Sequence, residues 1–265
     1  MPPPSGQGPA PAPAFLSIIQ HNCLGSWNVF LSLFELFKET ANYPSILLLE
    51  DPPVNKAQLP SFNVLKSFFS PVRKPRVAAY IHMSFLSNNT VLPRFKGVDD
   101  VLALDISSNE PLFGTAFHSF RIINAYSTNT VDHRIHSVPP DVLFPDLGFP
   151  LLVVGDLDIR NTSSDPVRHF SPREIASSTP NFEKAVQFGF ALLNPPGEYT
   201  RFPLVGKARP SVIDLTFANP ALLALVKSWE ACLPSTGSYH IPITITLAAP
   251  SLNQKPPRPR WADTD

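Results

Sequence analysis

The stretch that decides the fold is "PLLVVGDLDIRN", at residues 150–161. Four apolar residues run directly into Gly155, and two carboxylates, Asp156 and Asp158, follow. A continuous apolar run of this kind, bounded by Pro150 and Gly155, predicts a strand that is covered on both faces. Two acids would then stand at the end of a buried strand, and their function has to be inferred from the rest of the sequence.

Other short runs along the chain share the features of this one. They are rich in Val, Ile, Leu or Phe, and they are bounded by Pro, Asn, Asp or Gly. These predicted strands lie at 15–20, 45–50, 76–82, 100–106, 120–126, 211–217 and 241–247. Many strands of this kind require a second layer that packs against them.

Two stretches have the spacing of amphipathic helices instead. Residues 26–37 begin with Ser26, a possible N-cap, and place large apolar side chains on one stripe. These are Trp27, Phe30, Leu31, Phe34 and Phe37. Residues 179–190 place Pro180 at the first helical position and repeat apolar side chains at Phe182, Val186 and Phe190. Many strands and few helices predict an α/β (α+β) protein, a four-layered sandwich in which two mixed β-sheets pack face to face and helices cover the outer faces.

The composition of the 265 residues fits one globular domain with two biased ends. Residues 1–14 contain six prolines and no large apolar side chain beyond Met1, so we expect a disordered Pro/Ala-rich arm. Residues 250–265 contain four prolines, and we expect a linker-like tail there. One domain at 15–249 remains, which is long enough to bury a sizeable core.

Charge and cysteine content exclude some classes of protein. The 21 basic and 21 acidic side chains cancel, which counts against unaided, tight, non-specific DNA binding but allows an enzyme that touches a few phosphates. Candidates for such contacts lie in predicted loops, with ordinary surface charge as the alternative: Arg73, Lys74, Arg76, Arg160, Arg168, Arg201, Lys207 and Arg209. No apolar run approaches the roughly 18 residues that cross a bilayer, so we expect a soluble protein without membrane contact. Cys23 and Cys232 give no disulfide framework and fit a reducing compartment.

Polar side chains gather where the predicted strands end. Residues two apart in an extended chain face the same side, about 6.5–7 Å apart, so Asp156 and Asp158 are expected to line one pocket. An aspartate between Ile213 and Leu215 is expected to be buried, where it needs a partner. The complete set is Asn22, Glu50, Asp51, Tyr126, Asp156, Asp158, Asp214 and His240.

Each of these residues alone has an ordinary explanation as a turn, cap or surface residue. Together they are the residue types that metal and phosphate chemistry uses. Carboxylates hold a hard cation such as Mg²⁺, and Asn and Tyr supply neutral hydrogen bonds to phosphate oxygens. A histidine backed by an aspartate moves a proton or stabilises a charged transition state. The set therefore predicts metal-assisted hydrolysis of a phosphate ester.

The order of these motifs resembles the exonuclease–endonuclease–phosphatase superfamily over residues 15–249. That family has Asn, an acidic residue after a strand, Tyr, G-D-x-N, I-D and finally G-S-D-H. The stretches "QHNCLGSW", "LLNPPGEYTRFP", "ARPSVIDLTFANP" and "STGSYHIPI" are similar, more narrowly, to the endonuclease domain of fungal non-LTR (LINE-type) retrotransposons. The resemblance implies an Mg²⁺-dependent endonuclease (a phosphodiesterase), with Mn²⁺ as an alternative ion. It would nick DNA through contacts to the phosphate backbone, as a monomer, in the nucleus.

In those retrotransposons a reverse transcriptase is fused behind the endonuclease. None follows in this chain, and the tail "RPRWADTD" resembles the linker that leads to it. We therefore expect a detached or truncated endonuclease module.

The resemblance also implies roles for single residues. Asn22 would make hydrogen bonds to phosphate and to other active-site residues, and Tyr126 would contact phosphate. Asp156 would position or deprotonate the attacking water. Asp214 would organise the site, and His240 would contact the scissile phosphate.

The metal-binding acid of the family falls at Asp51, and Glu50 stands where the family usually has Gln. Adjacent residues of a strand face opposite ways, so only one of the two is expected to reach the site, and Glu50 is the alternative ligand. Arg201 and Ser211, in the motifs quoted above, are expected to contact the substrate.

Two residues depart from the family pattern, and we expect them to weaken the endonuclease activity. Asp158 replaces the Asn of G-D-x-N, which removes two N–H donors and adds an acceptor that repels phosphate. Tyr239 replaces the Asp of G-S-D-H, which would leave His240 without a carboxylate to fix its tautomer. Two alternatives therefore stay open: a catalytically inactive relic that only binds nucleic acid, and a phosphatase or lipid phosphodiesterase of the same superfamily, because a fold does not fix a substrate.

Overall fold

The computed structural model describes most of the chain, in residues 15–40, 43–53, 63–69, 75–94, 100–112, 117–127, 137–203, 209–231 and 236–248. The predicted arm at 1–14 and the predicted tail at 250–265 lie outside the described residues, as do Cys232, Arg73, Lys74 and Lys207. None of the helices in the described part of the chain is long and apolar enough to span a bilayer.

The described strands form two six-stranded sheets that share one plan. The first has the order β11-β12-β1-β2-β4-β3 and the second the order β5-β6-β7-β8-β10-β9. The first sheet comprises β1 (Phe15–Asn22), β2 (Ile46–Glu50), β3 (Leu65–Phe69), β4 (Val77–His82), β11 (Val226–Ala231) and β12 (Ile243–Ala248). The second comprises β5 (Thr90–Arg94), β6 (Val101–Ser107), β7 (Ser119–Tyr126), β8 (Leu151–Asp156), β9 (Ala191–Leu192) and β10 (Asp214–Ala218). In each sheet the two central strands are parallel, and their other neighbours are antiparallel.

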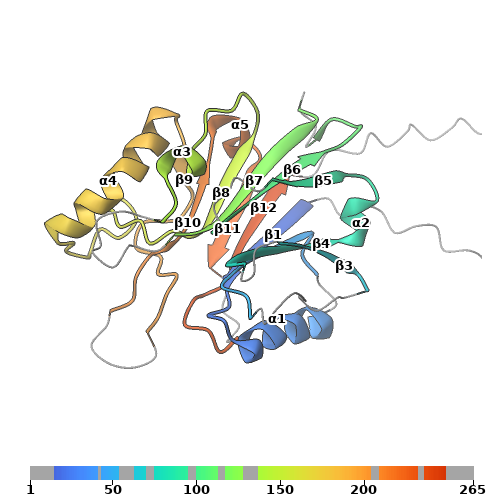
Figure 1. Ribbon diagram of the computed structural model, residues 1–265, viewed down its shortest axis with the longest axis horizontal. Helices are drawn as coiled ribbons and strands as arrows, with labels where there is room; N and C mark the ends of the chain where they lie inside the picture. The colour runs from blue at the N-terminus through green and yellow to red at the C-terminus, as the bar shows by residue number, and fades with distance from the viewer. Residues whose placement is uncertain are drawn as a thin grey trace, which may run out of the picture.

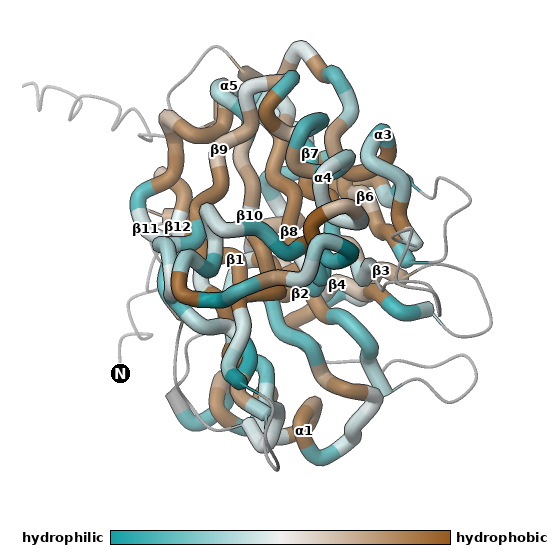
Figure 2. Tube along the Cα trace, turned by 90° about the vertical axis from the view of Figure 1, so that its left-hand side faces the viewer, coloured by the Kyte–Doolittle hydropathy of each residue, from teal (hydrophilic) through white to brown (hydrophobic). Residues whose placement is uncertain are grey.

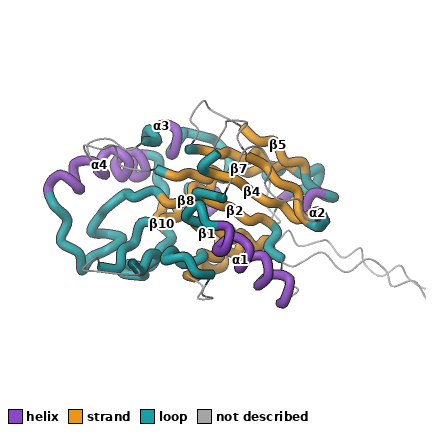
Figure 3. The backbone as a smooth tube through the Cα atoms, turned by 60° about the horizontal axis from the view of Figure 1, so that its bottom comes forward, coloured by secondary structure: helices purple, strands orange, loops and turns teal. Residues whose placement is uncertain are grey.

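The helices lie outside the two sheets (Figures 1 and 3). They are α1 (Trp27–Thr40), α2 (Met83–Leu86), α3 (Pro140–Leu143), α4 (Pro172–Gln187) and α5 (Pro220–Leu223). One buried cluster joins Phe30 of α1 to Leu47 of the first sheet, and another joins Ala185 of α4 to Phe217 of the second. A third cluster fills the space between the sheets. The four-layered sandwich with outer helices is therefore confirmed.

The central strands are buried on both faces, as their continuous apolar runs predict. In β2, Leu47 packs towards α1 while Leu48 packs towards the second sheet. In β8, Val153 and Val154 divide in the same way between the outer and inner clusters. Figure 2 shows the hydrophobic stretches along these strands. Burial of both faces explains why neither strand shows an alternating pattern.

All eight predicted strands are present, and the four that the sequence did not predict are β3, β5, β9 and β11. They stand at the two ends of each sheet order, so every one is an edge strand. Edge strands bury fewer side chains and tolerate charge and proline, as Lys227 and Pro93 illustrate. Their apolar signal is correspondingly weak.

The first predicted helix is confirmed, although its buried stripe is shifted. Ser26 Oγ accepts a hydrogen bond from Val29 N at 3.4 Å, at the start of α1. Trp27 and Leu31 are 39% and 49% exposed, so the prediction was wrong for these two residues. The buried face is centred on Phe30 and Leu33 instead, which places Trp27 and Leu31 towards solvent.

The second predicted helix begins earlier than the sequence analysis placed it. Ser171 caps α4 with a reciprocal capping box to Glu174, and Pro172, rather than Pro180, occupies the start of the helix. Pro180 lies inside the helix. Val186, predicted on the buried stripe, is 70% exposed. The capping box stabilises the true start of the helix. This start, Pro172, lies eight residues before Pro180, the proline that misled the prediction.

The side chains of Asn124 and Trp229 make hydrogen bonds that cross from one sheet to the other. Asn124 of β7 donates through Nδ2 to Leu49 O of β2 at 3.1 Å and to Ala78 O of β4 at 3.2 Å. Trp229 Nε1 of β11 donates to Thr216 Oγ1 of β10 at 3.0 Å. Buried polar groups of this kind need partners, and these contacts fix how the two sheets lie against each other.

Candidate active site

The predicted site residues meet at the carboxyl ends of the two parallel strand pairs. The register of β1 and β2 pairs Asn22 with Glu50, and the register of β7 and β8 pairs Tyr126 with Asp156. Asn22 Nδ2 donates to Asp156 Oδ2 at 2.8 Å, across the gap between the sheets. The same edge of each sheet therefore contributes to one place.

A cleft of about 250 Å³ opens there. The predicted residues that line it are Asn22, Tyr126, Asp156, Asp158, Arg160, Arg201 and His240. Asp214 and Glu50 are fully buried and lie beneath the surface. The structure thus brings together most of the residues that the motif order singled out.

Gly155 lets strand β8 end where it does. Its φ is +140°, and a Cβ built there would lie 1.8 Å from the carbonyl oxygen of Ala125 on the parallel neighbour β7. No side chain fits against that backbone. The glycine before Asp156 is therefore a steric requirement for delivering Asp156 beside Tyr126.

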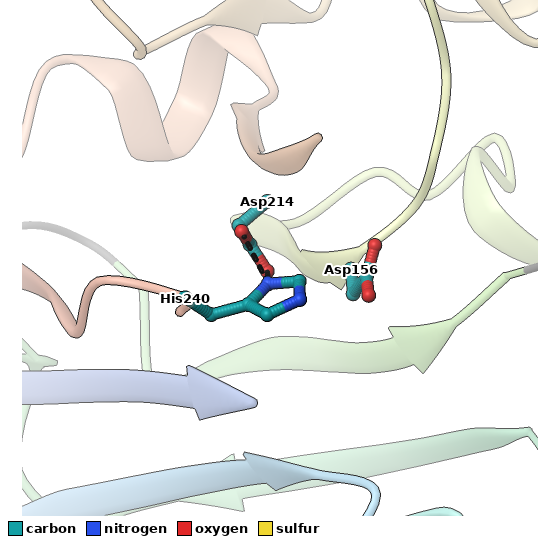
Figure 4. A group of neighbouring side chains, drawn as sticks. All are labelled: Asp156, Asp214 and His240. Carbon is teal, nitrogen blue, oxygen red and sulfur yellow. Dashed lines mark hydrogen bonds and ion pairs between the residues drawn. The ribbon is translucent and has the colours of Figure 1, made fainter. Parts of the chain in front are cut away.

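His240 has a carboxylate partner, contrary to the prediction from Tyr239. Its Nδ1 lies 2.9 Å from Asp214 Oδ2 and 3.0 Å from Oδ1, as the dashed lines in Figure 4 show. Thr200 Oγ1 accepts hydrogen bonds from the backbone N–H groups of Ile213 and Asp214, which holds Asp214 in place. The prediction failed because the partner comes from β10, 26 residues away in sequence.

The charge on Asp214 sets the protonation of the imidazole. Burial acts to lower the pKa of His240, but the charge of Asp214 and its hydrogen bond raise it above the usual value overall. His21, another buried histidine, shows the opposite result. Burial lowers its pKa to about 3, and its Nε2 lies 3.0 Å from the hydroxyl of Thr236. The charge of Asp214 acts on both histidines, but it is hydrogen-bonded to His240, and the pKa of His240 is the one that is raised.

Asp156 stands opposite Asp214 in the antiparallel register of β8 and β10. Burial, followed by the charge of Asp214, raises the pKa of Asp156 to about 8. The hydrogen bond from Asn22 and the charge of His240 act in the other direction. A carboxyl group whose pKa lies near neutrality suits a general base.

The donor set fits a divalent cation. One ligand atom from each of Asp156, Asp214 and His240 lies within 4.8 Å of the others (Figure 4). Glu50 is also fully buried nearby, and its Oε1 has no hydrogen-bond partner among the described residues. A buried carboxylate oxygen without a partner is costly unless it is protonated or holds a cation.

Glu50 faces the second sheet, as its contacts show. Gln20 Nε2 donates to Glu50 Oε2 at 2.7 Å, from the same face of β1 as Asn22. Burial raises the pKa of Glu50 well above its usual value, and the Gln20 hydrogen bond only partly opposes this. Asp51 follows β2 with φ +41° and does not line the cleft. Gln20 was missed by the sequence analysis, although it stands two residues before Asn22 on the strand.

Tyr126 lies under a guanidinium group. Arg76 sits 3.8 Å from the centre of its ring and forms an ion pair with Asp100 at 3.8 Å. Burial, then the charge of Asp156, raises the pKa of Tyr126 to about 12. The phenol therefore stays protonated at neutral pH and can donate a hydrogen bond into the cleft.

The two predicted substrate contacts are placed differently. Arg201 lines the cleft, and its guanidinium lies 5.1 Å from the ring centre of Tyr239. Its backbone pairs with both Ser211 and His240. Ser211 is buried, and it does not line the cleft. Ser211 therefore contributes to the backbone framework that holds Arg201 and His240.

Asp158 lines the cleft, although it is not in the extended chain that was predicted to place it. Strand β8 ends at Asp156, and Asp158 has φ +45°. Its Oδ1 accepts from Arg160 Nε at 3.0 Å and lies 2.9 Å from Arg160 Nη2. The negative charge of Asp158 is thus balanced by an arginine of the same cleft.

No known family model matches the sequence, and no curated protein matches it. Solved structures do match. The endonuclease domain of TRAS1, a telomere-specific non-LTR retrotransposon, has a TM-score of 0.63 at 15% identity, over 87% of this chain and 97% of that one. The AP endonuclease LMAP from Leishmania major has a TM-score of 0.64 at 13% identity, over 89% of each chain.

An AP endonuclease from Archaeoglobus fulgidus has a TM-score of 0.55 at 15% identity, over 88% of this chain and 99% of that one. These three endonucleases share the architecture of two packed sheets described above. The predicted resemblance is thus confirmed at the level of fold: the chain has the exonuclease–endonuclease–phosphatase fold.

Proposed function

We propose that this protein is a divalent-metal-dependent phosphodiesterase that nicks DNA, an endonuclease of retrotransposon origin. The observation that carries the proposal is the contact of His240 with Asp214 at 2.9 Å, beside Asp156 in one cleft. A charged imidazole next to a carboxylate of near-neutral pKa is the pair that hydrolysis of a phosphodiester needs. The fold shared with the three endonucleases supports the same reaction.

In this proposal the residues of the chain divide the work. Asp156, held by Asn22, accepts a proton from the attacking water. His240, kept protonated by Asp214, contacts a non-bridging oxygen of the scissile phosphate and stabilises the negative charge that grows there. Tyr126 donates a hydrogen bond to the phosphate.

Glu50 is the proposed ligand of the cation, Mg²⁺ or Mn²⁺, because it is fully buried and its Oε1 has no partner among the described residues. When bound, the cation would stabilise charge on the phosphate and lower the pKa of the carboxyl groups beside it, including that of Asp156. Asp51, the ligand that the family resemblance favours, becomes the alternative, because it is only partly buried. We propose DNA as the substrate, a monomer as the active form and the nucleus as its compartment, all from the family resemblance.

Nicking of supercoiled plasmid tests the function. The wild-type chain is incubated with plasmid in Mg²⁺ and in EDTA, beside His240→Ala and, as a matched control, His118→Ala, which alters an exposed histidine. We expect open-circular product in Mg²⁺ only, a loss of about 10²–10⁴-fold in His240→Ala, and no change in His118→Ala. Equal product from the wild type and His240→Ala would reject the proposal.

An inactive relic that only binds nucleic acid is the second candidate, and Asp158 and Tyr239 are the observations that favour it. The Asp214 contact to His240 counts against it. Restoring the family residues in one double variant, Asp158→Asn with Tyr239→Asp, separates the two. A large gain in nicking would favour the relic. A phosphomonoester offered in the same assay tests the phosphatase alternative, which turnover without nicking would support.

A further inference from the structure

Arg160 occupies an unusual position for a residue that the family motif does not include. It lines the cleft with Asn22, Asp156 and His240, and its side chain is 21% exposed. Its partner is Asp158, the aspartate that replaces the asparagine of the family motif. The cleft therefore contains a guanidinium close to where the family has the amide of an asparagine.

Two carboxylates fix the orientation of this guanidinium. Asp158 Oδ1 accepts from Nε at 3.0 Å and lies 2.9 Å from Nη2, while Glu174 Oε1 accepts from Nη1 at 2.9 Å. A guanidinium has five N–H donors, and the two hydrogen bonds use the one on Nε and one of the two on Nη1. Nη1 therefore keeps one donor, and Nη2, which contacts Asp158 as an ion pair, keeps at least one more. Donors on these two neighbouring nitrogens can bind a phosphate in bidentate fashion.

The support behind Arg160 is rigid. Glu174 belongs to the capping box of α4, where Ser171 N donates to its Oε2 at 2.8 Å. The backbone N–H of Arg160 itself donates to Ser178 Oγ of the same helix at 2.8 Å. The arginine is thus attached to the first two turns of α4 at both its backbone and its side chain, so little rotamer entropy is lost when it binds a ligand.

The charges of this network balance. Arg168 Nη2 lies 3.6 Å from Glu174 Oε1, so two arginines face two acids. Asp158 therefore adds no net negative charge to the cleft. An aspartate in place of the family asparagine is compatible with phosphate binding when an arginine accompanies it.

We infer that Arg160 supplies the phosphate-binding N–H donors that the family asparagine would supply, and that Asp158 is the positioning residue that holds it. This inference rests on the proposed phosphodiester substrate. It predicts that the aspartate is an adapted replacement and that restoring asparagine alone harms the site.

Binding of a fluorescein-labelled DNA duplex in EDTA tests Arg160 without requiring catalysis. Arg160→Met is expected to raise Kd by about 10-fold or more, because hydrogen bonds to charged groups contribute about 1.5–3 kcal/mol. It should also reduce the slope of log Kd against log salt by about 1. Arg160→Lys should keep the slope and lose part of the affinity, because it keeps the charge and loses the fork. Arg94→Met is the matched control, since Arg94 pairs with Asp105 and does not line the cleft.

Nicking rates test Asp158. Asp158→Asn in the wild-type background is expected to lower kcat several-fold, because Arg160 loses its anchor. In the Arg160→Met background the same change should cause no further loss. A gain of nicking in Asp158→Asn alone would overturn the positioning role.

The two failures are distinguishable. A wild-type chain that binds DNA without nicking it rejects the proposed function, while the comparison of Arg160→Met with Arg94→Met still decides the inference. Equal Kd values and equal salt slopes for the wild type and Arg160→Met overturn it. A wild-type chain that binds no DNA overturns both.

Discussion

Glu50 of β2 and Asp214 of β10 are two fully buried acids at one site, and they differ in what lies beside them. Asp214 has the imidazole of His240 at 2.9 Å, a partner that becomes cationic. Glu50 has only the amide of Gln20, and its other oxygen has no partner among the described residues. The protein itself compensates the charge of Asp214, whereas burial favours the protonated form of Glu50, and a charged Glu50 would need a cation from outside.

Removing the charge of Asp214 should have the largest effect on the reaction. In Asp214→Asn the imidazole loses the partner that keeps it protonated, so we expect nicking to fall by about 10²–10⁴-fold. The pH–rate profile should also lose the limb that reports His240. Asp105→Asn is the control, because Asp105 pairs with Arg94 and Arg121 and does not line the cleft. Nicking by Asp214→Asn within two-fold of the wild-type rate would contradict the role given to this pair.

Glu50→Gln should remove the response of the fold to metal. With Mg²⁺ at about 100 times its Kd, binding adds about 2.7 kcal/mol of stability. That corresponds to a rise in Tm of roughly 5–11 °C for a domain of this size. We expect this rise in the wild type and its absence in Glu50→Gln, measured by thermal unfolding with and without Mg²⁺. Asp51→Asn, tested in parallel, should keep the rise, and its loss there would assign the ligand to Asp51 instead.

The metal-free protein should become less stable as the pH rises from about 5 to 8. Asp156 keeps its proton up to a pKa of about 8 in the folded state, against a usual value of 3.8. Asp156 therefore makes stability fall as the pH rises through this window, and Glu50, whose pKa burial also raises, acts in the same direction. His21, whose pKa burial lowers to about 3, opposes these two groups below its usual value of 6.5. His240 has the same sign as Asp156, because its raised pKa gives stability that is complete below 6.5 and is lost as the pH passes the folded value.

Unfolding in EDTA across this range checks the prediction, and Asp156→Asn should flatten the curve. The paired acids Asp105 and Glu174 do not confuse the result. Ion pairs and hydrogen bonds lower their pKa values overall, although burial acts to raise them, so they titrate below this window. A stability that increases from pH 6.5 to 8, above the usual pKa of His21, would contradict the raised pKa of Asp156.

Gln20→Met should give the smallest change. It removes the hydrogen bond to Glu50 Oε2 and leaves a buried carboxyl group unsatisfied, at a cost of about 1–3 kcal/mol. Thermal unfolding should show a lower Tm in EDTA and a larger rise on adding Mg²⁺ than in the wild type. Asn194 also makes buried hydrogen bonds, but only to backbone groups: its Nδ2 donates to the carbonyl oxygen of Asp214, and its Oδ1 accepts from Thr216 N. Asn194→Met should therefore lower Tm without enlarging the Mg²⁺ response.

The central part of the fold could be read from the sequence because burial leaves a local mark. Runs such as "ILLLE" and "LLVVGD" are apolar at every position before the acid, which happens only when both faces of a strand are covered. The edge strands leave no such mark. The start of α4 was misplaced because Pro180 gives a stronger signal than the capping box at Ser171, although both residues are compatible with a helix.

The site was predictable as a set of residues and not as a set of contacts. The residues could be predicted because each is a polar residue next to an apolar run that marks a strand: Asn22, Tyr126, Asp156 and His240. The partner of His240 was misjudged because the prediction looked to the neighbouring Tyr239, while the true partner, Asp214, lies 26 residues away on β10. The contacts of Gln20 with Glu50 and of Arg160 with Glu174 also join segments that only the folded chain brings together.

The side chain of Asn124 shows how the two halves of the site stay aligned. Interfaces of Leu, Ile and Val alone allow one sheet to slide over the other by a small step, because one methyl contact replaces another. Asn124 forbids this slip, because its amide binds the carbonyl groups of Leu49 and Ala78 at fixed places on the opposite sheet. Leu49 is the residue before Glu50, and Asn124 is two residues before Tyr126. The buried amide of Asn124 therefore sets the spacing across the cleft. A substitution of Asn124 would misalign the two halves of the site and slow the reaction, although every catalytic side chain would still be present.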